Sequence, residues 1–418
     1  MAGLTADDAR LLDRLQAETL RHFRDLAHPV SAMARERTAG AVDYDVAETV
    51  TTGGTGFGVM ALIAGAERGF LPAGEAVARI ATICGFLETA DRFRGAFPHW
   101  MGGRTGRTIA FSPQDDGGDV VETAFLMMGL LTARQWLAGR DPRLAGRLDA
   151  LWRGVDWAGY CRTPTQLMWH WSPAHDWARD LPVTGWHEGL VTYVLAAGSP
   201  THPIDPAAYV QGWQSGAWFR NGQVAHGIRL PLGPPMGGPL FFAHYSFLGL
   251  DPRGLRDGAA DYWVQNCAHV RINHAHCLAN PHGWRGYGPA WGLTACDGDR
   301  GYDAFSPTND RGVIAPTAAL ASMPYAPDLA LAALRHYDRL MDGALWGPAG
   351  FYDAFNETAG WVAPGHLAID QGPIVAMVEN ARSGLLWRLF MSAPEVAAGL
   401  DRLGFAPRPA RAPAAPLA

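Results

Sequence analysis

Apolar residues recur at three- and four-residue spacing along most of the chain, which is the pattern of helices that turn one face towards a core. Few stretches show the two-residue alternation of a half-buried strand. The pattern therefore predicts a largely helical protein with twelve helical segments. These segments are Ala9–Leu26, Gly56–Arg68, Glu75–Thr89, Glu122–Leu137, Arg143–Tyr160, Gly189–Ala197, Pro206–Ser215, Phe241–Gly249, Tyr262–Ala279, Ala315–Ser322, Ala326–Met341 and Gly372–Phe390.

The segments between the predicted helices are long and rich in Gly, Pro, His, Trp and Asp, notably Phe97–Gly118, Met168–Glu188, Gly222–Pro239 and Asn280–Ile314. Twelve helices joined by such loops fit six outer and six inner helices wound into an all-α (α/α)6 barrel, whose loops build a cleft at one end. We expect this barrel to occupy residues 1–405 as one domain. A Pro/Ala-rich tail over residues 406–418 is predicted to be disordered.

Composition narrows the class of protein. Only 18% of the residues are charged, whereas there are 50 glycines and 16 tryptophans, so glycine-rich loops and aromatic side chains replace much of the usual charged surface. This balance is typical of sugar-binding enzymes. The formal net charge is −6 and no run of Lys and Arg occurs, which argues against a nucleic-acid partner.

Cysteines and hydropathy indicate the cellular setting. The five cysteines are odd in number and show no C-x-x-C spacing, so no disulfide framework is expected. No stretch of eighteen apolar residues occurs, and no basic segment followed by an apolar one opens the chain, so no membrane partner is expected. We expect a soluble protein, cytoplasmic as the sequence stands or periplasmic if an export signal preceded it.

Carboxylates cluster ahead of two predicted helices. The run from Asp115 to Glu122 leads into an apolar segment, so Asp119 and Glu122 share one face of a first helical turn. Acids held there can transfer protons, although a charged helix start with a capping Asp explains the run equally well. Glu188 stands in similar aromatic company before the next apolar run. Two such sites predict a carbohydrate-processing cleft.

Seven segments together resemble the bacterial glycoamylase-like group that contains the family 144 β-1,2-glucanases. They are 116–126, 184–190, 199–203, 238–249, 291–298, 315–320 and 368–374. The resemblance runs in order from about residue 10 to about residue 405. It implies an (α/α)6 barrel that cleaves β-1,2-glucan or sophoro-oligosaccharides by inversion, without a metal or other cofactor.

Relatives in the wider group carry out retaining transglycosylation instead, so that activity stays an alternative to hydrolysis. A non-catalytic glucan-binding protein is the alternative from another class, and a polysaccharide lyase is a further one. The chain departs from the family pattern at His187, where Asn is more typical, and at Cys296, where a small residue such as Ser is. Endo or exo mode, chain-length preference and oligomeric state are left open.

Glycoside hydrolysis needs one carboxylic acid to protonate the leaving oxygen and one carboxylate to activate water or attack the anomeric carbon. Glu188 is our candidate for the acid, because Trp186 and the following apolar run offer a desolvated setting and the resemblance implies an essential Glu there. For the base, Asp370 lies between apolar residues, where an acid is costly to bury unless it is paired or used. Asp119 is an equal candidate and Glu122 the next.

Sugar rings stack on aromatic rings, and their hydroxyl groups bond to Asp, Asn, His and Arg. The segment from Asp297 to Asp303 looks like a calcium loop but lacks the later bidentate Glu, so no metal site is predicted. The expected partner is a β-glucan oligosaccharide or polysaccharide substrate. Its predicted contacts are Asp116, His99, Trp100, Trp186, His187, His244, Tyr245, Tyr287, Trp291, Asp297 and Asp310.

Overall fold

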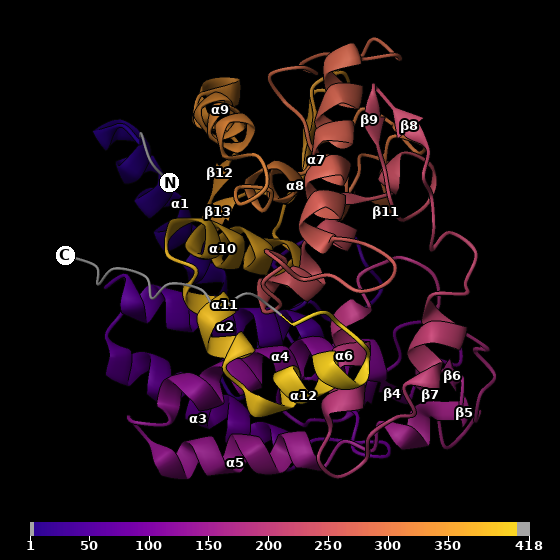
Figure 1. Ribbon diagram of the computed structural model, residues 1–418. Helices are drawn as coiled ribbons and strands as arrows, with labels where there is room; N and C mark the ends of the chain where they lie inside the picture. The colour runs from indigo at the N-terminus through magenta and orange to yellow at the C-terminus, as the bar shows by residue number, and fades with distance from the viewer. Residues whose placement is uncertain (1–3, 408–418) are drawn as a thin grey trace.

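Outer and inner helices alternate along the chain in the computed structural model, which describes residues 4–407. Figure 1 shows the resulting (α/α)6 barrel, with the outer helices α3 and α5 along one edge. The outer members are α1 (Ala6–Arg24), α3 (Ala73–Leu87), α5 (Pro142–Arg153), η2 (Ala208–Trp213), α7 (Tyr262–Ala279) and α9 (Pro327–Tyr337). The inner members are α2 (Thr52–Glu67), α4 (Val120–Leu137), α6 (Leu190–Gly198), η5 (Tyr245–Leu248), α8 (Pro316–Leu320) and α10 (Ala368–Arg382).

Burial separates the two sets. Inner helices are buried on nearly all sides, so their sequences carry little amphipathic pattern, whereas outer helices bury one stripe. In α5 that stripe is Leu144, Leu148 and Leu151 with their neighbours, and the helix begins at an Asp141 cap followed by Pro142. Around the inner ring, α2 packs against α4 and α10, and α4 packs against α6. The predicted helical barrel is confirmed.

Some element boundaries differ from the predicted ones. The predicted Gly372–Phe390 helix is two helices, α10 and α11 (Leu385–Met391), because Gly384 adopts a φ of 68° between them. The predicted Pro206–Ser215 helix is the π-helical turn η2, and Phe241–Gly249 forms two 3₁₀ turns, η4 (Leu240–Ala243) and η5. The pattern missed α12 (Pro394–Arg402), which packs against α6.

Helix α2 begins four residues earlier than the periodicity indicates, because its first turns contain glycines that the helix needs for packing. A Cβ atom at Gly56 would overlap the carbonyl oxygen of Phe125, and one at Gly129 would overlap that of Gly56. Only glycine lets α2 and α4 approach this closely, backbone against backbone. Gly53, also in α2, lies against the carboxyl group of Glu122 in the same way.

The described strands are short and pair only as antiparallel hairpins or ribbons. One three-stranded sheet joins β1, β2 and β3, and β4 pairs with β7, which brings Asp119 opposite His170. The strands are β1 (Thr49–Thr51), β2 (Trp100–Gly102), β3 (Thr108–Ile109), β4 (Gly118–Asp119), β5 (Cys161–Thr163), β6 (Gln166–Leu167), β7 (His170–Trp171), β8 (Val224–Ala225), β9 (Ile228–Arg229), β10 (Ala295–Cys296), β11 (Asp303–Ala304), β12 (Trp346–Gly347), β13 (Gly350–Phe351), β14 (Phe355–Asn356) and β15 (Trp361–Val362). Further 3₁₀ turns are η1 (Ala158–Tyr160), η3 (Pro235–Gly237) and η6 (Leu340–Gly343).

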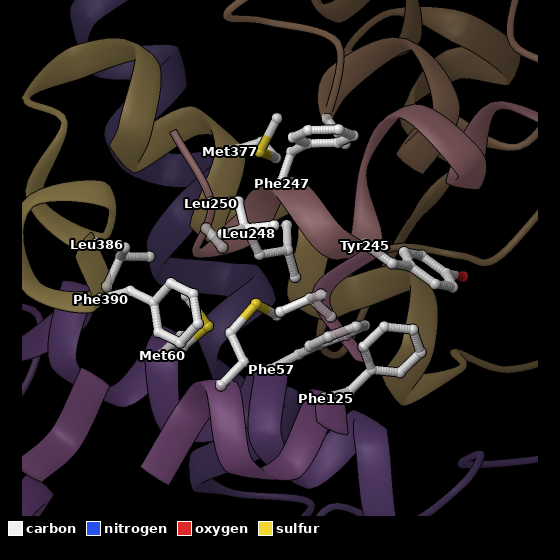
Figure 2. Packing of buried hydrophobic residues seen from close by; sticks show 14 of the residues in the cluster. Phe57, Met60, Phe125, Tyr245, Phe247, Leu248, Leu250, Met377, Leu386 and Phe390 are labelled. Carbon is white, nitrogen blue, oxygen red and sulfur yellow. The ribbon is translucent and has the colours of Figure 1, made fainter. Parts of the chain in front are cut away.

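One continuous cluster of buried apolar side chains extends from Leu12 to Phe405. Figure 2 shows part of it, where Phe57, Phe125 and Tyr245 pack together and the Tyr245 hydroxyl group points away from the cluster. Within residues 4–407, no helix has the length and apolar character that a bilayer crossing requires. Of the tail for which we predict disorder, 408–418 lies outside the described residues, and the Ala406 N–H donates to the Arg256 carbonyl at 2.8 Å.

Candidate active site

A cavity of about 360 Å³ opens among the loops that lead from the outer helices into the inner ones. Two of the four predicted catalytic acids, Glu188 and Glu122, line it, whereas Asp119 and Asp370 do not. Aromatic and charged side chains make up most of the remaining wall. The lining residues are Glu36, Arg37, Val42, Tyr44, Thr51, His99, Trp100, Phe111, Glu122, Phe125, Trp169, Glu188, Phe241, Tyr245, Ala295, Tyr302, Leu367 and Ile369.

Asp119 caps the N-terminus of α4, and its two carboxylate oxygens are occupied by protein donors. Oδ1 accepts the N–H groups of Val121 and Glu122, both at 2.9 Å. Oδ2 accepts the indole N–H of Trp169 at 3.0 Å and lies 3.1 Å from Nδ1 of His99. Because Asp119 is only 2% exposed, it acts on the cavity by orienting these two rings.

Glu122 projects into the cavity from the first turn of α4. Its Oε2 accepts the Gly53 N–H at 2.8 Å, and its Oε1 lies 4.0 Å from Nε2 of His99. Burial raises the pKa of Glu122 to about 7, against the opposing attraction of the His99 charge. A carboxyl group of this acidity exchanges a proton readily near neutral pH.

His99 is the positive partner of this carboxylate pair. Burial alone disfavours its charged form, but the charges of Glu122 and Asp119 outweigh burial and raise the pKa of His99 to about 9. The ring stacks on Phe111, with centroids 4.0 Å apart. At neutral pH the site therefore holds an imidazolium ion between two acids.

Glu188 stands in the turn that leads into α6. The Ser246 hydroxyl group donates to its backbone carbonyl and accepts the Val191 N–H at 2.9 Å, which fixes the turn. Nδ1 of His187 accepts the Gly189 N–H at 3.1 Å and lies 3.3 Å from Oε2 of Glu188. A backbone N–H can only donate, so Nδ1 of His187 is unprotonated and accepts this bond, which holds the ring edge beside the Glu188 carboxyl group.

Asp370 is 1% exposed at the start of α10, behind the wall that Leu367 and Ile369 form. Its carboxyl group meets no N–H donor among the described residues and faces the carboxyl group of Asp353. Burial and then the Asp353 charge raise the pKa of Asp370 well above its usual range, and burial raises the pKa of Asp353 to about 7. Two buried carboxyl groups in contact share a proton near neutral pH.

The predicted sugar contacts divide into three groups by position. His99, Trp100 and Tyr245 line the cavity, and His187 stacks on the lining residue Trp169 with centroids 5.4 Å apart. Burial keeps the pKa of Tyr245 well above its usual value, so its hydroxyl group stays protonated and can donate. These four residues remain candidates for contact with substrate.

Three predicted contacts belong to the core instead. Trp186 is 2% exposed and packs against Tyr262, and Trp291 is 1% exposed. His244 lies 3.0 Å from the Ser322 hydroxyl oxygen, and burial lowers its pKa to about 3. We correct their placement accordingly, because a buried aromatic ring contributes packing rather than a surface for sugar.

The other predicted contacts also lie outside the cavity wall. Asp116 accepts the Ser172 hydroxyl at 2.6 Å and does not line the cavity. Tyr287 donates to Asp310 at 2.7 Å in a separate buried cluster with His276. Burial favours a neutral Asp310, but the hydrogen bonds from His276 and Tyr287 outweigh it and lower its pKa.

Asp297 reaches the cavity only through Arg37, whose Nη1 lies 2.9 and 3.1 Å from its two oxygens. Glu36 and Tyr44 complete this network, because both Arg37 and the Tyr44 hydroxyl donate to Glu36. Glu36, Arg37 and Tyr44 were not among the residues predicted from the sequence. The only local sign of them is a charged loop segment. The partner Asp297 is 260 residues away from Arg37, so no local pattern shows that the two residues pair.

Three comparisons relate the chain to known proteins. Residues 180–394 match the family model Glycoamylase, described as "Putative glucoamylase". The chain is 42% identical over 422 residues to the exo beta-1,2-glucooligosaccharide sophorohydrolase (non-reducing end) of Parabacteroides distasonis. That match covers 95% of this chain and 58% of the relative, so the chain spans little more than half of the relative's length.

Two solved structures are similar over nearly their whole length. The endo-beta-1,2-glucanase from Chitinophaga pinensis, in complex with sophorotriose and glucose, is 47% identical with a TM-score of 0.93. A "putative glucoamylase" from Bacteroides uniformis is 49% identical with a TM-score of 0.93. Each match covers 97% of this chain and 99% of the other.

Proposed function

The chain belongs to the Glycoamylase family, and from this membership and the cavity we propose that it hydrolyses β-1,2-linked glucan or sophoro-oligosaccharides. The observation that carries the proposal is the pair of carboxyl groups, Glu188 and Glu122, on one aromatic-lined cavity. Relatives named for β-1,2-glucan hydrolysis at 42% and 47% identity support the choice of substrate. The substrate would be a neutral β-glucan, with its rings against Trp100, Trp169 and Tyr245.

In the proposed reaction, Glu188 donates a proton to the glycosidic oxygen as its bond to the anomeric carbon breaks. A water molecule attacks that carbon and gives a proton to Glu122, with inversion of configuration. The raised pKa of Glu122, about 7, makes it a stronger base than an ordinary carboxylate. Asp119 would position His99 and Trp169 rather than react, because its oxygens are occupied.

The Asp370 carboxyl group is a weaker candidate for the base. Burial and the neighbouring Asp353 raise the pKa of Asp370, which favours its neutral form, and Asp370 has no place on the cavity wall. A general base must be ionised and within reach of the attacking water. Glu122 meets both conditions better.

The first experiment incubates the purified protein with linear β-1,2-glucan and with short sophoro-oligosaccharides and resolves the products by size over time. A ladder of mixed oligomers indicates endo cleavage, and one small product from the outset indicates exo cleavage. Larger or cyclic products favour the transglycosylase. Absence of any product from either substrate overturns the proposal.

The second experiment tests the acid. Glu188→Gln removes the transferable proton and keeps the shape, so turnover of unactivated glucan should fall about 10²- to 10⁴-fold while binding persists. Asp116→Asn is the matched control, since Asp116 is near the site but does not line the cavity. An E188Q protein with unchanged turnover contradicts the assignment. Proton NMR of the first-formed product reports whether the configuration inverts.

A further inference from the structure

A second cavity, of about 430 Å³, is lined in part by residues that directly precede a wall residue of the catalytic one in the sequence. Asp299, Arg300 and Gly301 line the second cavity, and the next residue, Tyr302, lines the first. Tyr302 is 53% exposed, so this loop, which contributes to both cavities, lies at the surface. A flexible polymer bound in one cavity is therefore close to the other.

Trp284 gives the second cavity an aromatic surface that is fixed before any ligand binds. Its backbone N–H donates to the Asn280 Oδ1 at 2.8 Å, and the Asn280 side-chain amide donates to its carbonyl at 2.9 Å. The indole ring lies on Gly312, where a Cβ atom would come within 2.9 Å of it. Trp284 is nevertheless only half-buried, so part of the ring is available to a ligand.

Polar side chains that can form further hydrogen bonds line the same cavity as this ring. Asp299 Oδ1 accepts one N–H from Asn356 at 3.2 Å, and its Oδ2 lies 3.8 Å from Nε of the exposed Arg300, a long contact that a ligand hydroxyl group can replace. The Arg311 guanidinium pairs with Asp303 at 3.2 Å and is 56% exposed. A carboxylate and a guanidinium beside an aromatic face can bind the hydroxyl groups of a neutral sugar while its C–H face stacks.

We propose that the second cavity is a glucan-binding site, which holds glucosyl units of the chain whose cleavage takes place in the first cavity. This inference rests on the proposed function. It predicts that the second cavity contributes to the binding of long glucan and not to the turnover of a short oligosaccharide that fills only the first. Trp284 would be the main contact and Arg311 a lesser one.

The test compares Trp284→Ala with the wild-type protein on long linear β-1,2-glucan and on the shortest sophoro-oligosaccharide that is cleaved. KM for the long glucan should rise about three- to tenfold, the effect of losing one aromatic contact, with kcat and short-substrate turnover within about twofold. Trp284→Phe should restore part of the affinity. Trp218→Ala is the matched control, since Trp218 is 61% exposed and lines neither cavity.

Arg311→Ala tests the same cavity with a variant that should fold normally, because an exposed ion pair contributes little to stability. It keeps the proposal testable if the Trp284→Ala protein misfolds. It should raise the same KM by a smaller factor. Equal losses on both substrates, or none on the long glucan for Trp284→Ala and Arg311→Ala alike, overturn the second site while leaving the hydrolase intact. If the wild-type protein cleaves neither substrate, the proposed function fails and the second site fails with it.

Discussion

Helices α4 and α10 both belong to the inner ring and both carry an acid in their first turn, Glu122 and Asp370. At α4 a histidine faces the acids, and the carboxyl group of Glu122 opens onto the cavity. At α10 a second acid, Asp353, faces Asp370, and both are closed off from solvent. The same position in the same kind of helix therefore gives an ion pair in one case and a shared proton in the other.

The difference comes from segments that fold over each helix start. His99 precedes β2, and the Asp119 cap brings its ring against Glu122. Asp353 lies just before β14, and its Oδ2 accepts the Asp297 N–H at 2.8 Å. A buried acid with a cationic neighbour is available for proton transfer, whereas a buried acid with an acidic neighbour is neutralised. The comparison can be tested from either helix.

The largest effect is expected from Glu122→Gln. It removes the proposed base, so turnover of β-1,2-glucan should fall about 10²- to 10⁴-fold. It also removes a charge that raises the pKa of His99 to about 9, so that pKa should fall. An NMR titration of the His99 ring measures the second effect independently of catalysis. An unchanged His99 pKa would contradict the ion-pair description of α4.

The next effect is expected from His99→Gln, which removes the cation and leaves the acids. The pKa of Glu122 should then rise above about 7, by roughly one unit. As this pKa rises, the ionised fraction of the base at pH 7 falls, so kcat/KM at pH 7 should drop about fivefold. The acidic side of the plot of kcat/KM against pH should move to higher pH. A uniform loss at every pH would indicate a structural role for His99 instead.

A smaller effect, on stability rather than activity, is expected from Asp370→Asn. In the folded protein Asp353 and Asp370 have raised pKa values, so their contribution to stability is intact at pH below about 4 and is lost as pH rises towards 7. The asparagine removes one titrating group and can donate to Asp353, so the decrease in Tm between pH 5 and pH 8 should be smaller than in the wild-type protein. Parallel Tm profiles would contradict the shared proton.

The smallest effect is expected from Asp116→Asn. Asp116 belongs to the same acidic run as Glu122, but its side chain is 36% exposed and bonds to the Ser172 hydroxyl group. Turnover should stay within about twofold of wild type, because a partly exposed polar contact contributes little. A large loss in a full kinetic comparison would mean that the substrate path extends over Asp116.

The fold was predictable because long apolar segments alternate along the chain with loops rich in Gly, Pro, His, Trp and Asp, which marks the helices even where burial on nearly all sides leaves little amphipathic pattern. The position of Asp119 and Glu122 at the start of a helix, as its N-cap and in its first turn, and the prominence of Glu188 were also predictable, since they depend on neighbours in the sequence. Which loop tryptophans reach the cavity was not. Trp186 and Trp169 each precede a histidine in the same long loop, yet Trp186 packs in the core and Trp169 lines the wall.

The remaining unpredicted features depend on contacts between distant segments. Arg37 and Asp297 are 260 residues apart, and the contact between Asp353 and Asp370 requires a loop to meet the start of α10. No periodicity or motif marks such a pair. The charge that a site residue carries is therefore less predictable than its position on a helix.

The glycine contact between α2 and α4 links the helix spacing to the acidity of the site. Gly56 and Gly129 set the distance between the two helices, and Gly53 on α2 donates the hydrogen bond that Glu122 on α4 accepts. A methyl group added at Gly129, well inside the barrel, would separate the helices and lengthen that bond. In a mutational scan of this protein, the substitutions that shift the pH optimum should therefore lie along the contact between α2 and α4. Their distance from the bound sugar should matter less.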